Sequence, residues 1–417
     1  MSHPLFAGID VHSRINRTCL LDRDGEPWGK RFSTDNNRPG TQALIVRLIE
    51  VLRQGPFDSL AVAVEATNWY WFGLYQALHD DPVLAHWPQT FYTLNPRVTA
   101  RYKETFSDKD KSDDSDAYIT ADRLRTYSRQ DLPAPFDPDL QYLGLRFLTR
   151  YRYHLVQDLV SEKNRCLSLL YLKANEYRED HPFADVFGAT SRALINEFAS
   201  FEEIAAMPLE ELASWLDAKG KGRLADPQKV ARELQQVIQD SYPLRPALQP
   251  QLNLVLTWSF ELVNFLERQI QRTNTAIAEA MRSMPHTLET IPGFGPVYSA
   301  GIIAEIGNLD RFNHDEAKVA QYAGLHWRKN ESADFKAEDT RLTKRGNAYL
   351  RYYFCEAANA VRMHDADYAA YYQRKHDEVR THQHKRAVAL TARKLVRLVV
   401  RLLTTNQPYQ PGRHASG

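Results

Sequence analysis

The chain has 417 residues, 43% of them hydrophobic and 25% charged, with a net charge of +1, which indicates two or three globular domains and excludes wholesale disorder. It contains no apolar stretch of the roughly 20 residues that a membrane helix needs, and its N-terminal residues do not resemble a secretory signal. The three widely spaced cysteines fit neither a metal site nor a disulfide framework, so we expect a cytoplasmic protein.

The first 130 residues alternate between strand and helix patterns. Short strands are predicted at Leu5–Asp10, Arg17–Asp22 and Glu26–Ser33. The later pattern predicts a helix at 38–54, a strand at 59–65, a helix at 69–79, a strand at 89–94 and a helix at 112–125. The predicted order is three strands followed by helix, strand, helix, strand and helix. This is the order of the ribonuclease-H-like fold, an α/β fold with helices on a mixed sheet.

A proline-rich break at 132–138 separates this first domain, predicted to cover 1–137, from a long-helix region predicted at 138–284. Two long helices are predicted there, each with one apolar face, and they pair either within the chain or between chains. Their apolar faces are formed by Leu145, Leu148, Leu155, Leu159, Cys166 and Leu169, and by Leu252, Val255, Leu262, Leu266, Ile270, Ile277 and Met281. Extra helices are predicted between them, at 177–250.

The last part, predicted at 285–417, combines short helices with a basic amphipathic helix at Lys385–Thr404. Residues 341–417 contain 15 Lys and Arg against 5 Asp and Glu, so the remainder of the chain is acidic. Such an asymmetry is typical of a polyanion-binding domain, and also of an ordinary solvated basic face. The candidate phosphate contacts are Lys344, Arg345, Arg351, Arg386, Arg393, Lys394, Arg397 and Arg401.

Four acids lie where a ribonuclease-H-like fold would gather them. Asp10 ends the first strand and Glu65 the fourth, while Asp113 and Asp116 share one face of the last helix. Converging carboxylates repel one another unless a hard cation such as Mg²⁺ neutralises them. Two such ions, about 4 Å apart, stabilise the attacking and leaving oxygens of a phosphate. The alternative is that these are exposed acids at the ends of strands and helices.

Motifs around these acids resemble the DEDD-type transposases of bacterial insertion sequences, the IS110 family. Gly8-Ile9-Asp10-Val11-His12 is similar to the family's first acidic motif, and Glu65-Ala66-Thr67 is similar to the second. Lys111-Ser112-Asp113-Asp114-Ser115-Asp116-Ala117 is similar to the third, commonly Lys-Thr-Asp-x-x-Asp-Ala. Asn68 departs from the family, which often has glycine after the second motif.

The resemblance continues in the C-terminal part. Ile291-Pro292-Gly293-Phe294-Gly295-Pro296 is similar to the start of the family's transposase domain. Its glycines are typical of a helix-hairpin-helix turn that brings backbone N–H groups to a phosphate, and also of a tight turn between packed helices. The family has a nucleophilic serine, usually in Gln-Ser-Gly, before a Lys-Arg-Gly-Asn motif. Ser332, in Glu331-Ser332-Ala333, is the matching position.

This resemblance implies a RuvC-like first domain and an enzyme that excises and inserts its own DNA element. It implies that Ser332 forms a covalent phosphoserine link with DNA while the four acids hold Mg²⁺. The implied partners are donor and target DNA, a structured bridge RNA that pairs with both, and further copies of the chain in a dimer or tetramer.

Two alternatives remain. In a RuvC-like structure-specific endonuclease, water replaces the serine as the nucleophile and the C-terminal domain only binds DNA junctions. The second alternative is a non-catalytic protein that binds nucleic acid and shows no metal-dependent cleavage. The four acids argue against it, because they lie at the positions expected from the ribonuclease-H-like order of strands and helices.

Overall fold

The computed structural model divides the chain into two compact units, Met1–Pro138 and Asp139–Gly417. The structure describes residues 3–106, 113–127, 136, 139–179, 182–183, 185–198, 201–327, 331–332, 335–336, 342–343 and 346–411. At 113–114 and at the described positions of 331–336, only the backbone is described. Among the described residues, no helix has the length and apolarity needed to cross a membrane.

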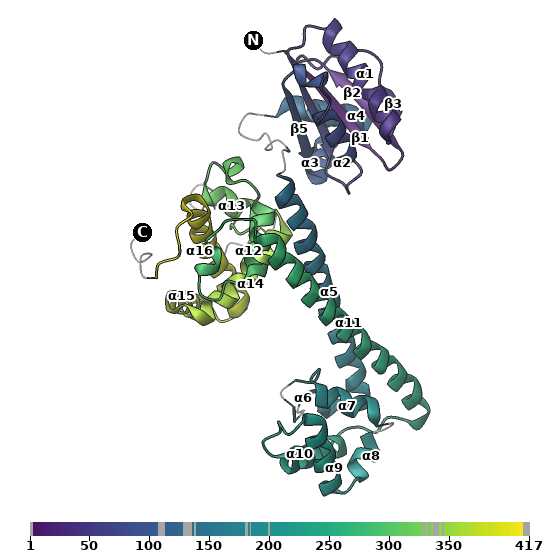
Figure 1. Ribbon diagram of the computed structural model, residues 1–417, viewed down its shortest axis with the longest axis vertical. Coiled ribbons are helices and arrows are strands. Elements are labelled where there is room, and N and C mark those ends of the chain that lie inside the picture. Colours follow the sequence, from purple (N-terminus) through teal and green to yellow (C-terminus); the bar gives the residue numbers. More distant parts are fainter. Residues whose placement is uncertain are drawn as a thin grey trace. The chain divides into compact units, whose positions relative to one another are not determined.

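The first unit is built on a five-stranded mixed sheet (Figure 1) with the strand order β3-β2-β1-β4-β5. Strand β1 pairs antiparallel with β2 and parallel with β4, and β4 pairs parallel with β5. The strands and helices of this unit are β1 (Pro4–Val11), β2 (Ile15–Leu21), β3 (Phe32–Asp35), α1 (Arg38–Gln54), β4 (Ser59–Glu65), α2 (Phe72–His79), η1 (Leu84–His86), β5 (Gln89–Leu94), α3 (Pro96–Lys103) and α4 (Asp113–Thr126). The predicted order of elements is confirmed, with α3 as an unpredicted addition.

Two predicted boundaries in this unit are wrong. The third strand was expected at Glu26–Ser33 but covers only Phe32–Asp35. Pro27 has no backbone N–H to donate to a neighbouring strand, and Gly29 has a left-handed φ of 86°, so the strand does not begin earlier. The helix expected from Trp69 begins only at Phe72. Asn68 has a φ of 53°, and this left-handed turn delays the helix.

The two faces of the sheet have different cores. On one face, alternate residues of β1 and β4 pack against α1 and α2, in a cluster that includes Leu5, Ile9, Leu44, Leu48, Leu60, Val62, Val64, Leu74 and Leu78. On the other face, α4 places Ala117 and Ala121 against Cys19 and Leu21. The small side chains of α4 bring its backbone close to the sheet.

Gly8 is the point of closest approach between β1 and α4. A methyl group at Gly8 would lie 2.7 Å from the Ala121 Cβ and closer still to the Ala117 carbonyl oxygen and the Ala121 amide. Backbone atoms cannot move aside as a flexible side chain does, so only glycine fits there.

We therefore expect Gly8→Ala to destabilise the first unit by roughly 1–3 kcal/mol, because the added methyl overpacks the sheet–helix contact. The matched control is Gly73→Ala in α2, where an added Cβ meets nothing within 4 Å and alanine is the better helix former. Urea unfolding of the full-length chain measures both variants. Equal midpoints for Gly8→Ala and wild type would contradict this packing.

The second unit starts with a pair of long antiparallel helices, α5 (Leu140–Lys173) and α11 (Gln249–Met281). The start of α5 and the end of α11 share a cluster containing Leu145, Ile277 and Met281. The predicted apolar face of α11 is partly wrong, because Val255 and Leu262 are exposed. Its buried side is formed by Leu256, Phe260, Val263 and Leu266.

Between these long helices lies a helical insertion with its own core around Tyr177, Leu212 and Leu234. Its helices are α6 (Asn175–Glu179), α7 (Ala189–Glu197), α8 (Phe201–Ala206), α9 (Leu209–Gly220), α10 (Pro227–Gln239) and η2 (Pro246–Leu248). The elements after α11 are η3 (Leu288–Thr290), α12 (Pro296–Ile306), η4 (Leu309–Phe312), α13 (Glu316–Ala323), β6 (Glu331–Ser332), β7 (Phe335–Lys336), α14 (Ala348–His364), α15 (Ala366–Asp377) and α16 (Gln383–Thr405). Helix α16 is the predicted basic amphipathic helix.

Candidate active site

The register of β1 and β4 places Asp10 beside Glu65. Ile9 lies opposite Val64 in this parallel pair, so Asp10 and Glu65 occupy the next position at the carboxyl ends of both strands. Neighbouring strands are about 4.8 Å apart, and aligned residues point to the same face. That face is the one covered by α4, because Asp10 lies two residues after Gly8 and strand side chains alternate.

Helix α4 runs with its N-terminus toward these strand ends. Ala117 and Ala121 lie over Gly8, while Leu124, farther along α4, clusters with Phe6 and Ala61 near the starts of β1 and β4. Asp113 and Asp116 are in the first turn of α4, so they belong to the end of the helix nearest Asp10 and Glu65. The side chain of Asp113 lies outside the described part of the chain.

Helix α3, which the sequence analysis missed, supplies two contacts to the acids. The Thr99 hydroxyl donates to Glu65 Oε1, and the Lys103 ammonium pairs with Asp116 Oδ1. A signal for α3 was present, because Asn95 caps its N-terminus and Pro96 is its first residue. A cation and a hydroxyl donor thus already face two of the four candidate carboxylates.

Two further contacts hold the surroundings in place. His12 Nε2 donates to Asp10 Oδ2 at 3.2 Å. Tyr102 of α3 donates to Asp122 Oδ2 of α4 at 2.6 Å. Burial, together with this bond to Asp122, raises the pKa of the Tyr102 phenol. The phenol therefore stays protonated at neutral pH and keeps α3 attached to α4.

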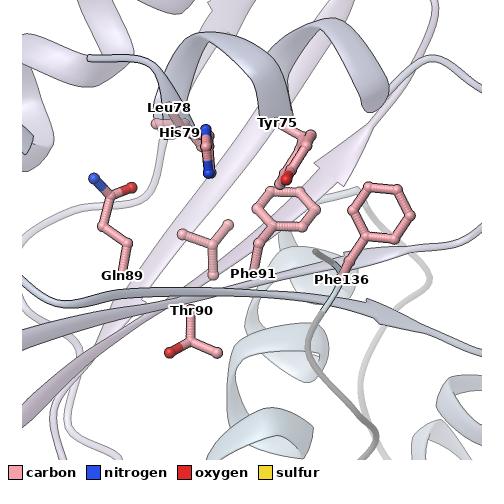
Figure 2. A pocket seen from close by; sticks show the side chains of 8 residues that line it. Tyr75, Leu78, His79, Gln89, Thr90, Phe91 and Phe136 are labelled. Atoms are coloured by element: carbon pink, nitrogen blue, oxygen red, sulfur yellow. The ribbon is translucent and has the colours of Figure 1, made fainter. Parts of the chain in front are cut away.

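The described residues contain no group of three or more His, Cys, Asp or Glu side chains placed to chelate a metal ion. A cavity of about 260 Å³ in this unit lies on the opposite side of the sheet. Figure 2 shows the rings of Tyr75, Phe91 and Phe136 along it, with His79 and Gln89 also at its edge. The sheet separates this cavity from the acids, because Val62 points into the core formed with α1 and α2.

Ser332 lies in a short two-stranded hairpin of the second unit. It pairs with Phe335 between β6 and β7. Trp327 and Leu342 form an antiparallel bridge closer to the base, where the Thr343 amide donates to the His326 carbonyl at 3.0 Å. We call its described residues, 326–327, 331–332, 335–336 and 342–343, the 326–343 hairpin. Lys344 and Arg345, two of the expected phosphate contacts, lie outside the described residues.

The two glycines of the predicted helix-hairpin-helix turn differ in their surroundings. Gly293 has a φ of 82°, and a methyl group there would lie 2.7 Å from the His364 ring. It is therefore required for packing against the end of α14. Gly295 precedes α12, and an added Cβ there meets nothing within 4 Å. Of the two, Gly295 has the open surroundings that a phosphate would need.

Several candidate phosphate-binding cations also make contacts inside the second unit. Arg351 donates to the Ala323 carbonyl at 3.0 Å, and Arg386 donates to Glu378 at 3.0 Å. Arg397 donates to Glu316 at 2.9 Å, with Arg393 4.0 Å from the same carboxylate. The Arg351 bond joins α14 to α13, and the other pairs attach α16 to its neighbouring helices. Their expected role in binding nucleic acid remains a prediction.

Lys394 of α16 lies against two aromatic rings of α15. The Lys394 ammonium lies 4.6 Å and 4.8 Å from the ring centres of Tyr368 and Tyr371, and burial lowers its pKa. Arg401 is exposed.

Comparison with known proteins identifies the family. Residues 7–173 match the model of the DEDD transposases of IS110 elements, and residues 285–373 match the model described as the transposase IS116/IS110/IS902 family. The chain belongs to the IS110 family of transposases. As a transposase, it is an enzyme that acts on DNA. The first match covers the sheet with its acids and α5, the second covers α12 to α15, and the helical insertion lies between them.

Two curated relatives agree with this assignment. A protein of insertion element IS116 from Streptomyces clavuligerus is 25% identical over 410 residues, which cover 98% of this transposase and 96% of that protein. A protein of Streptomyces coelicolor, named as a candidate transposase of the IS117 mini-circle, is 25% identical over 337 residues, covering 77% and 75% of the two chains. The similarity to the first relative therefore extends through both units.

Proposed function

We propose that this transposase cuts and rejoins DNA in a Mg²⁺-assisted reaction, with Ser332 as the nucleophile and Asp10, Glu65, Asp113 and Asp116 as the metal-binding acids. The observation that carries the proposal is the register that aligns Asp10 with Glu65 on the face covered by α4. The strand order and the position of α4 support a ribonuclease-H-like, specifically RuvC-like, first domain.

The chemistry of these donors fits a hard divalent cation. All four groups are carboxylates, which are the ligands that Mg²⁺ prefers, and Lys103 supplies a positive charge at Asp116 in the described structure. When bound there, Mg²⁺ would neutralise charge that develops on the phosphate oxygens. Asp10 and Glu65 would bind it from the strand ends, and Asp113 and Asp116 from α4.

In the proposed reaction, Ser332 Oγ forms a bond to phosphorus while the bond from phosphorus to a sugar oxygen breaks. The hydroxyl proton passes to a base, and the leaving sugar oxygen gains a proton, so no external energy source is required. Attack by a sugar hydroxyl on the phosphoserine reverses these changes and releases the rejoined strand. A covalent intermediate of this kind retains the energy of the phosphodiester bond.

Trapping the covalent protein–DNA adduct distinguishes this reaction from the alternative, which is cleavage by a RuvC-like nuclease that uses water as the nucleophile. The full-length protein is incubated with Mg²⁺, RNA transcribed from the non-coding DNA that flanks its coding region, and a plasmid carrying that flanking DNA, and the reaction is stopped with denaturant. Serine attack predicts labelled DNA that stays bound to protein until protease digestion. Free DNA ends without any adduct would favour water.

We further propose that a bridge RNA and more than one copy of the chain take part, as the family resemblance implies. The basic α16 and its neighbours are the candidate surface for nucleic acid. Purified protein should recombine donor and target plasmids only after RNA transcribed from the flanking non-coding DNA is added, and the complex should sediment as a dimer or tetramer. Full recombination after ribonuclease treatment would contradict the RNA requirement.

A further inference from the structure

Glu305 is a carboxylate with no exposed surface, and the proposed reaction gives it no role. It lies on α12, and Arg150 of α5 donates to both of its oxygens, at 2.7 and 2.9 Å. Arg146, one turn earlier on α5, lies 3.7 Å from the same carboxylate and donates to the Ala304 carbonyl at 2.8 Å. Burying a carboxylate is unfavourable unless it is paired, so these arginines hold the charge in place.

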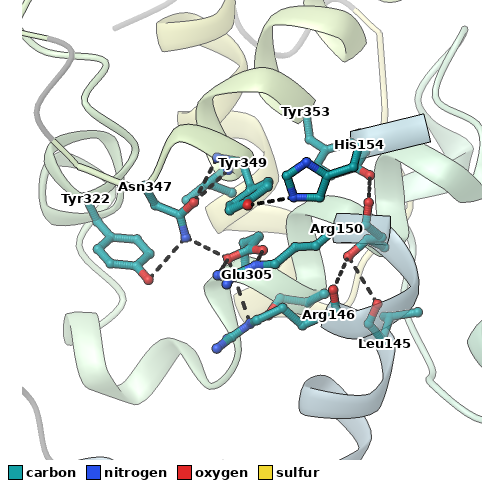
Figure 3. Close-up of polar contacts among 12 residues, drawn as sticks. Leu145, Arg146, Arg150, His154, Glu305, Tyr322, Asn347, Tyr349 and Tyr353 are labelled. Atoms are coloured by element: carbon teal, nitrogen blue, oxygen red, sulfur yellow. Dashed lines mark hydrogen bonds and ion pairs between the residues drawn. The ribbon is translucent and has the colours of Figure 1, made fainter. Parts of the chain in front are cut away.

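Another partner of Glu305 is Asn347, the N-cap residue of α14. Asn347 Oδ1 accepts from the amides of Tyr349 and Leu350, each at 3.0 Å. This capping bond turns Nδ2 toward Glu305 Oε2, to which it donates at 2.6 Å. Figure 3 shows the Asn347 amide between Glu305 and Tyr322, whose hydroxyl is 3.2 Å from Nδ2. The bond to a charged acceptor is short and strong.

Asn347 also closes the base of the 326–343 hairpin. Its backbone amide donates to the Tyr322 carbonyl at 2.6 Å, so the chain segments that lead into and out of the hairpin are joined there. Gly346 has a φ of 133°, and a Cβ there would overlap the Tyr322 carbonyl. An isolated two-stranded hairpin is marginally stable in water. The orientation of this hairpin therefore depends on how its base is fixed.

We propose that Glu305 and Asn347 are positioning residues for Ser332. The carboxylate, held by two arginines of α5, fixes the Asn347 amide, and Asn347 fixes the base of the hairpin that carries Ser332. This inference rests on the proposed serine chemistry for its catalytic consequence, but not for its structural part. A misplacement of about 1 Å at a reacting group lowers a rate by about 10²-fold.

The variant Asn347→Ser tests the proposal, because serine is an equally good N-cap but lacks the amide that reaches Glu305 and Tyr322. The matched control is Asn308→Ser. Asn308 caps η4 in the same unit, and its amide donates to Asp310 rather than to any part of the hairpin. Both variants are made in the full-length chain and assayed with the flanking-DNA plasmid, the RNA transcribed from the flanking DNA, and Mg²⁺.

Three quantities are measured: the single-turnover rate of adduct formation, the Kd for the plasmid, and the hydrogen exchange of the Thr343 amide. We expect Asn347→Ser to slow adduct formation by about tenfold or more, to leave Kd unchanged and to accelerate Thr343 exchange, while Asn308→Ser changes none of them. Glu305→Gln should also slow adduct formation, and its loss of rate should not add fully to that of Asn347→Ser, because the two residues share the Asn347 Nδ2 contact.

Unchanged Thr343 exchange in Asn347→Ser would overturn the proposal, and so would faster exchange with an unchanged rate of adduct formation. A wild-type protein that forms no Ser332 adduct would instead refute the serine chemistry. The exchange measurement would then still show whether Asn347 holds the hairpin, so the two failures are distinguishable.

Discussion

Replacing Ser332 with alanine is expected to lower DNA cleavage by at least about 10³-fold and to abolish the covalent adduct. The substitution removes only the hydroxyl oxygen that would bond to phosphorus, so the proposed covalent step loses its nucleophile. Binding of the plasmid and of RNA should remain, because the proposed phosphate contacts are elsewhere in the second unit. The measurement is the yield of protein–DNA adduct and of cut strands after a single turnover.

Ser283→Ala is the control for this experiment. Ser283 is exposed just beyond α11, and its hydroxyl donates to the Ala280 carbonyl at 3.2 Å, so its loss should leave the reaction unchanged. Cleavage by Ser332→Ala at the wild-type rate would show that another nucleophile is used. An adduct that persists in Ser332→Ala would place the covalent link on a different residue.

Asp10→Asn and Glu65→Gln are expected to lower Mg²⁺-dependent cleavage by about 10²-fold or more, because charge stabilisation by a metal ion is worth several kcal/mol. Both substitutions keep the size of the side chain and remove its negative charge. Asp116→Asn should have the same effect and also release Lys103. A second readout is thermal stability, since a ligand that binds only the folded protein raises Tm. The rise in Tm with Mg²⁺ should shrink in each variant.

Glu50→Gln is the matched control, because Glu50 is an exposed carboxylate of α1 that contacts only Arg47, at 3.5 Å, among the described residues. Its cleavage rate and Mg²⁺ response should equal those of wild type. If Asp10→Asn retained the wild-type Mg²⁺ dependence of both cleavage and Tm, the metal-site assignment would be wrong, whatever the result for Ser332.

Much of the first unit could be predicted from local sequence pattern. The bounds of α1, β4 and β5 agree with those expected, because helical spacing of leucines or a short run rich in apolar and aromatic residues coincides with clear turn residues at the ends. Helix α3 was missed because its eight residues include few apolar side chains, and the residue it buries is the polar Thr99. The face of α11 was misjudged because both of its sides are rich in apolar residues, and periodicity alone does not say which side meets α5.

Some residues of the candidate site could also be predicted from the sequence, while the contacts that hold them could not. The order of the predicted elements indicated the acids, because each acid ends a recognisable strand or begins a helix. The resemblance of short motifs to the family indicated the serine. Sequence did not reveal that Thr99 and Lys103 contact these acids, or that Glu305 and Asn347 fix the base of the hairpin. These contacts join residues up to 42 positions apart. Such pairings depend on strand register and helix packing, which arise from the burial of many side chains at once and leave no local signature.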